Sequence, residues 1–125
     1  MNREMRFSKK FVIRTVEELE KNWNELLAKL APQFGEGLDL QAILFLVGVQ
    51  ELGMGYRKFS KDQKLDVMHI AICTLLSPYG YYEWEGRDAD GWPHWKATAK
   101  LPHLKPAQQH TLMREALIEY FKENL

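Results

Sequence analysis

The longest apolar run in the chain extends from Leu38 to Leu52 and contains almost no polar side chains. A helix that is apolar on every side has to be enclosed by other elements. Asp39 is a suitable N-cap for such a helix, and Gly53 can adopt the left-handed conformation at its end. The pattern therefore predicts a buried central helix over about residues 40–52.

Three other segments have apolar residues at intervals of three and four, which predicts amphipathic helices. Thr15 with Glu18, and Ser60 with Gln63, form the capping boxes that begin two of them. We expect Pro32 to end the first of these helices. The three predicted helices cover residues 15–31, 61–76 and 106–123.

The packing of the central helix depends on Gly48, which lies in its middle. Glycine destabilises a helix interior, so its presence favours a close crossing by a neighbouring helix. We also expect the central helix to pack antiparallel to the helix over residues 61–76, to which a short link joins it. The predicted buried face of the helix over residues 61–76 includes Leu65, Met68, Ile72, Leu75 and Leu76.

Between the third and fourth helices the composition changes to aromatic residues, glycines and prolines. Two aromatic segments flank a turn that contains Asp88, Asp90 and Gly91, which predicts a β-hairpin or extended segment over about residues 79–97. The expected fold class is therefore mainly α: one domain, 1–125, in which about four helices form a compact bundle around the central helix.

The overall charge excludes strong electrostatic attraction to nucleic acid or to an anionic membrane. The composition excludes little else. The chain has 17 basic and 17 acidic side chains, and residues 1–14 form a possible basic arm of undetermined conformation. Nucleic acid is an unlikely partner, and no membrane partner is expected because the apolar run is shorter than the roughly 20 residues of a membrane span. One cysteine, Cys73, and the absence of a signal-peptide pattern predict a cytoplasmic location.

The helix over residues 61–76 carries the most specific set of chemical groups. Asp62, Asp66, His69 and Cys73 follow one another at spacings of four, three and four, which places them on one side of the helix. Asp62, Asp66 and His69 are candidates for a divalent metal site, to which Glu51 of the central helix could add an oxygen ligand. Asp66, His69 and Glu51 are the candidates for catalysis. Ordinary structural roles explain the same residues, and only one Asp-x-x-His pair is present, so no cofactor is expected.

The aromatic hairpin is the second candidate site. Tyr82, Trp84, Trp92, His94 and Trp95 could form a surface that binds a ligand or a protein partner. The alternative is that these rings close the core, because two strands alone are marginally stable in water.

The favoured function is a non-catalytic protein-interaction or self-association module that uses this aromatic surface. Its partner would be another protein or a second copy of the chain. The alternative is a metal-assisted, hydrolase-like enzyme centred on Asp66 and His69, and the third hypothesis is weak nucleic-acid binding through the basic arm.

Overall fold

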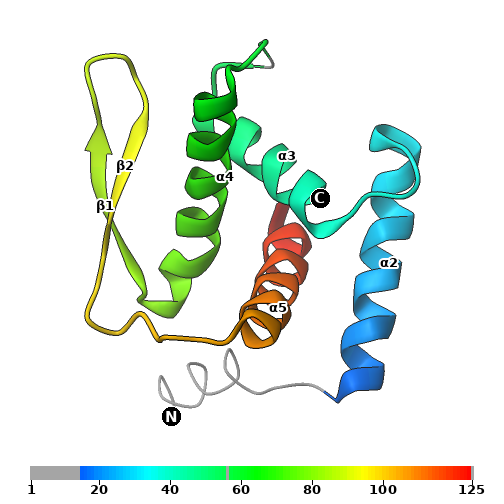
Figure 1. The fold of residues 1–125 in the computed structure, drawn as a ribbon. Coiled ribbons are helices and arrows are strands. Elements are labelled where there is room, and N and C mark those ends of the chain that lie inside the picture. Colours follow the sequence, from blue (N-terminus) through cyan, green and yellow to red (C-terminus); the bar gives the residue numbers. More distant parts are fainter. Residues whose placement is uncertain (1–14, 56, 125) are drawn as a thin grey trace.

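The computed structural model describes residues 15–55 and 57–124 of the chain. These residues form the helices α2 (Val16–Phe34), α3 (Leu40–Leu52), α4 (Lys61–Leu76) and α5 (Pro106–Asn124), with a short 3-10 turn, η1 (Ser77–Tyr79). Strands β1 (Tyr82–Arg87) and β2 (Pro93–Ala97) form a hairpin between α4 and α5 (Figure 1). The predicted mainly helical fold with a hairpin between its last two helices is confirmed. The basic arm of residues 1–14 lies outside the described residues.

The starts of three helices follow from their capping residues. Both predicted capping boxes are present, at Thr15 and at Ser60, and the Asp39 carboxylate accepts a hydrogen bond of 2.8 Å from the backbone N–H of Ala42. Gly53 adopts the left-handed conformation at the end of α3. Such groups satisfy backbone donors and acceptors that a helix end leaves unpaired, and α3 and α4 begin and end at the predicted residues.

Pro32 does not end the first helix as expected, because α2 continues to Phe34. A proline removes its own N–H from the helix and its ring crowds the carbonyl four residues earlier, but the residues that follow it remain free to adopt helical angles. The N–H of Gly35 still donates to the carbonyl of Ala31 at 2.8 Å. The cost of the missing hydrogen bond is therefore limited to the last turn.

The apolar character of α3 on all sides is explained by two hydrophobic clusters on its opposite faces. Ile43, Leu44 and Val47 belong to the larger cluster, which they share with α2, α5 and part of α4. The opposite face contributes to a smaller cluster around Phe59 and α4, through Phe45, Val49 and Leu52. None of the described helices is long and apolar enough to cross a bilayer.

The predicted close crossing at Gly48 is confirmed, and the neighbouring helix is α4. A Cβ atom added to this glycine would lie 2.1 Å from the carbonyl oxygen of Val67 on α4. The prediction that Leu65 is buried is wrong, since its side chain is 62% exposed. At about 100° per residue, Leu65 lies on the side of α4 opposite Val67 and Ala71, which face α3. No other described element covers Leu65 on that side.

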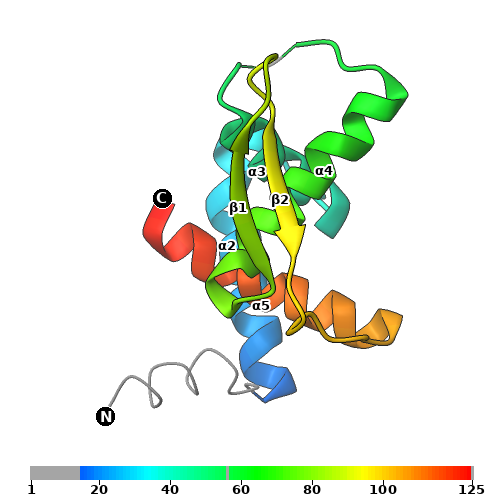
Figure 2. The same cartoon turned by 90° about the vertical axis from the view of Figure 1, so that its left-hand side faces the viewer.

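The hairpin lies along the side of α4 that faces away from α2 (Figures 1 and 2). Its antiparallel strands pair Trp84 with Trp95, and the register shifts by one residue between Trp84 and Gly86. The guanidinium of Arg87 donates hydrogen bonds to the carbonyls of Leu52 at 3.0 Å and of Glu51 at 3.2 Å. The hairpin is thereby attached to the last turn of α3 as well as to α4.

Candidate functional site

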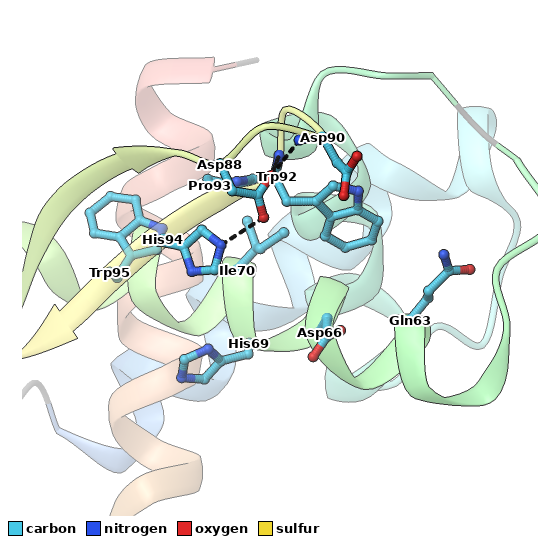
Figure 3. A pocket seen from close by; sticks show the side chains of 10 residues that line it. All are labelled: Gln63, Asp66, His69, Ile70, Asp88, Asp90, Trp92, Pro93, His94 and Trp95. Carbon is cyan, nitrogen blue, oxygen red and sulfur yellow. Dashed lines mark hydrogen bonds and ion pairs between the residues drawn. The ribbon is translucent and has the colours of Figure 1, made fainter.

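A cleft of about 390 Å³ lies between α4 and the hairpin. The helix contributes Gln63, Asp66, His69 and Ile70 to its lining, and the hairpin contributes Asp88, Asp90, Trp92, Pro93, His94 and Trp95 (Figure 3). The two candidate sites that the sequence presents separately, the polar side of one helix and the aromatic hairpin, therefore form the two walls of a single cleft.

The hairpin wall is organised by Asp88, which lies in the turn between the strands. One of its carboxylate oxygens accepts hydrogen bonds from the backbone N–H groups of Asp90 at 2.9 Å and Trp92 at 3.0 Å. The other lies 2.8 Å from Nε2 of His94. The hydrogen bond with His94, followed by that from Trp92, lowers the pKa of the Asp88 carboxyl. The imidazole of His94 is thus oriented by a carboxylate that remains ionised at neutral pH.

The helix wall is organised around His69. One of its ring nitrogens lies 3.6 Å from the sulfur of Cys73, one turn further along α4. The ring of Tyr82 meets the imidazole edge-on, with 6.1 Å between the ring centroids. Burial raises the pKa of the Cys73 thiol to about 12, so this thiol is a packing group and not a nucleophile.

Two of the candidate metal ligands lie away from the cleft. The hydroxyl of Tyr120 on α5 donates a hydrogen bond of 2.6 Å to the Glu51 carboxylate. Asp62 is exposed on α4 and is not part of the cleft lining. Asp66 and His69 remain, and within residues 15–55 and 57–124 no group of three or more His, Cys, Asp or Glu side chains is arranged to hold a metal ion.

The indole rings of the hairpin have different environments. Trp92 is half-buried and packs edge-on against Phe59 of the smaller cluster, at 6.4 Å between centroids. Trp95 packs against Trp84 at 5.1 Å, and Trp84 is 50% exposed. The Nε1 atom of Trp95 is buried and has no hydrogen-bond acceptor among the described residues. Trp92 therefore packs against the core and also lines the cleft, whereas Trp84 extends the aromatic surface toward solvent.

Sequence reasoning did not identify the pairing of Asp88 with His94 or the role of Arg87. In turns, an aspartate side chain often accepts a hydrogen bond from the backbone N–H two residues later. Asp88-Ala89-Asp90 has this spacing and forms this hydrogen bond, so the sequence carried a signal for it. Arg87 has no such signal, because the carbonyls it binds are 35 and 36 residues away in the chain.

The cleft combines aromatic faces, carboxylates and two imidazoles, a mixture that can bind a polar ligand and orient it. Among the described lining residues there is no serine, threonine or cysteine, so this lining offers carboxylates and imidazoles but no hydroxyl or thiol nucleophile. No family model, no curated protein and no solved structure matches this chain.

Proposed function

We propose that this protein is a non-catalytic binding module that engages a protein partner, or a second copy of itself, through the cleft between α4 and the hairpin. The observation that supports the proposal best is the cleft, in which Trp92, Trp95 and His94 stand opposite His69 and Asp66. A volume of about 390 Å³ suits a few side chains of a partner segment.

The composition of this region also supports protein binding. Interface centres are enriched in tryptophan and tyrosine, and they are surrounded by polar groups that stay in contact with water. Trp84 is 50% exposed at the side of Trp95, and the carboxylates of Asp66 and Asp90 are exposed at the cleft. An indole that remains this exposed contributes little to the core, so its burial by a partner would gain apolar contact area.

The proposal is tested by selection from a library of random peptides displayed on phage, with the full chain as bait. We expect sequences that bind the wild-type protein to bind the double variant His69→Ala/His94→Ala about tenfold more weakly. Both histidines are exposed, so the variant should fold, which circular dichroism verifies. Leu65→Ala is the matched control, because Leu65 is also exposed on α4 but lies outside the cleft.

Sedimentation velocity over a range of concentrations tests the second copy as partner. Self-association that is lost in the double variant and retained in Leu65→Ala would identify the partner as the chain itself. If no selected peptide depends on the two histidines, and if the protein stays monomeric, the binding-module proposal is wrong.

A second candidate function is metal-assisted catalysis centred on Asp66 and His69. It is favoured by one observation: both residues line the same cleft as His94, whose imidazole is already oriented by Asp88. A carboxylate that fixes a histidine ring is typical of metal sites and of general bases. Glu51 is engaged by Tyr120 and Asp62 lies outside the cleft, so His94 would have to complete the set.

Thermal denaturation of untagged protein with added zinc, manganese or iron tests this second candidate. A bound metal would raise the midpoint of unfolding, and the rise would be lost in His69→Ala. No shift with any of the three metals would argue against metal-assisted catalysis and would leave the binding-module proposal unaffected.

A further inference from the structure

We propose that the cleft between α4 and the hairpin receives a cationic side chain, an arginine or a lysine, from a basic segment of the protein partner. This inference rests on the proposed binding function and names the chemical class of its ligand. Three aspartates, Asp66, Asp88 and Asp90, line the cleft, and no lysine or arginine among the described residues does so. The two sides of the cleft therefore present negative charge to whatever enters it.

Two of these carboxylates are available to a ligand. Asp88 is occupied, since its oxygens are bound by two backbone N–H groups and by His94. The side chains of Asp66 and Asp90 are exposed and form no hydrogen bond or ion pair with any described residue. They belong to different walls, α4 and the hairpin turn, so a cation held between them would connect the two elements (Figure 3).

The indole rings favour the same class of ligand. The face of an indole carries negative electrostatic potential and attracts a guanidinium or ammonium group within about 6 Å of its centre. Elsewhere in this protein the guanidinium of Arg114 lies over the ring of Trp23, at 5.1 Å from the centroid. In the cleft, Trp92 provides such a ring beside Asp90, and Trp95 lines the same wall on the other side of His94 (Figure 3).

Other ligand classes fit the lining less well. A phosphate or a carboxylate ligand would face Asp66 and Asp90 without a lysine or arginine among the described lining residues to offset the repulsion. A purely apolar ligand would cover these carboxylates and remove them from water, which is unfavourable for charged groups. A guanidinium is weakly hydrated, stacks on indoles and pairs with carboxylates, so it satisfies both parts of the lining.

The test uses the full chain and capped pentapeptides of the form Gly-Gly-X-Gly-Gly, with X as arginine, lysine, citrulline or glutamate. Binding is followed by NMR, through the indole N–H resonances of Trp92 and Trp95. We expect arginine and lysine peptides to shift these resonances saturably, and the binding to weaken as salt is added. Citrulline has the shape of arginine without its charge, so it should bind about fivefold to tenfold more weakly.

Variants separate the cleft carboxylates from general surface charge. Asp66→Asn with Asp90→Asn should weaken the arginine peptide by about fivefold to tenfold, because two partly exposed charge pairs are lost. Asp62→Asn is the matched control: it removes an exposed carboxylate of the same helix that does not line the cleft, and binding should be unchanged.

The outcomes distinguish this inference from the proposed function. Equal binding of arginine and citrulline peptides, or no effect of the Asp66→Asn/Asp90→Asn variant, would overturn the cationic ligand. The absence of any saturable shift with the arginine and lysine peptides would also overturn it. The binding function would still stand if the peptide library yields ligands that depend on His69 and His94 and contain no basic residue.

Discussion

The missing side chain at Gly48 sets how closely α3 and α4 can approach. The carbonyl oxygen of Val67 and its Cγ1 atom would lie 2.1 Å and 2.7 Å from an added Cβ, and the carbonyl is backbone that cannot rotate away. Any larger residue must therefore separate the two helices along their contact. Glycine is tolerated in this helix interior because it permits the close packing that stabilises the pair.

Gly48→Ala should destabilise the protein, although alanine is the better helix former. Overpacking of this kind costs about 1–3 kcal/mol, which exceeds the gain in helix propensity of about 1 kcal/mol. Urea denaturation measures the difference in the free energy of unfolding. Gln50→Ala, at an exposed position of the same helix, is the control and should change the free energy of unfolding by less than about 0.5 kcal/mol. Equal stability of Gly48→Ala and wild type would contradict the close crossing.

The hydrogen bond between Tyr120 and Glu51 joins α5 to the last turn of α3. Burial, then the hydrogen bond to Glu51 and the charge of that carboxylate, raise the pKa of the Tyr120 hydroxyl. The stabilisation from this group is complete below the ordinary tyrosine pKa of about 10, and it is lost as the pH rises through the higher folded value.

Tyr120→Phe should lower the free energy of unfolding at neutral pH by about 1–2 kcal/mol, since a hydrogen bond to a charged acceptor is lost. The gap between wild type and variant should stay constant below about pH 9 and shrink above about pH 10. Denaturation at several pH values measures it. Tyr82→Phe is the control for the hydrogen bond at neutral pH, because the Tyr82 hydroxyl makes no hydrogen bond to any described residue. It is not compared across pH, since burial raises the pKa of Tyr82 as well. A gap that does not change with pH would refute the raised pKa.

At the scale of elements, the hairpin depends on its neighbours for stability. Two strands alone are marginal in water, and here Trp92 packs on Phe59 while Arg87 binds the carbonyls of Leu52 and Glu51. The same guanidinium also donates to the carbonyl of Gly91, at 2.7 Å, across the hairpin turn. One arginine thus satisfies unpaired carbonyls at the end of α3 and holds the turn that presents the hairpin wall of the cleft.

Arg87→Met keeps much of the aliphatic length of the side chain and removes all three hydrogen bonds. We expect a loss of about 1–2 kcal/mol in the free energy of unfolding, because the group is exposed and water partly replaces the lost partners. Lys96→Met, which removes another positive charge from the exposed part of the same hairpin, should have little effect. Amide hydrogen exchange should also accelerate at β1 and β2 in Arg87→Met, and unchanged exchange there would contradict the anchoring role.

At the scale of the whole molecule, α4 connects the two hydrophobic clusters and the cleft. Near its end it is buried on several sides, and the Cys73 side chain is 0% exposed. Nearer its start, the side of the helix that carries Leu65 is exposed. The same helix therefore supplies core packing at one end and ligand-accessible side chains at the other.

Because Cys73 is enclosed and burial raises the pKa of its thiol to about 12, its reaction with iodoacetamide should report unfolding of the whole molecule. We expect slow labelling of the native protein and faster labelling as urea increases, in step with loss of helical circular dichroism. Leu65→Cys should add a second thiol that reacts at once without urea, as mass spectrometry can resolve. Rapid labelling of Cys73 in the native protein would show that α4 opens locally.

The local features of this protein follow from neighbouring residues in the chain. Helix starts at Asp39 and Ser60, the end of α3 at Gly53 and the hairpin turn at Asp88 depend on hydrogen bonds and backbone angles within about four residues, so their signals lie in adjacent sequence. Gly48 is the one long-range contact that the sequence indicated, because a glycine in a helix interior weakens the helix unless a neighbouring element packs closely against it.

The groups that meet in the cleft and across the helices are set by contacts between distant parts of the chain. The hairpin runs alongside α4 and brings His94 opposite His69. The hydroxyl of Tyr120 on α5 binds the Glu51 carboxylate, which does not line the cleft. Helical periodicity shows which residues share a side, and it does not show which side another element covers, as the exposure of Leu65 illustrates. Loop geometry and the competition among apolar faces set these contacts, and both are properties of the whole chain.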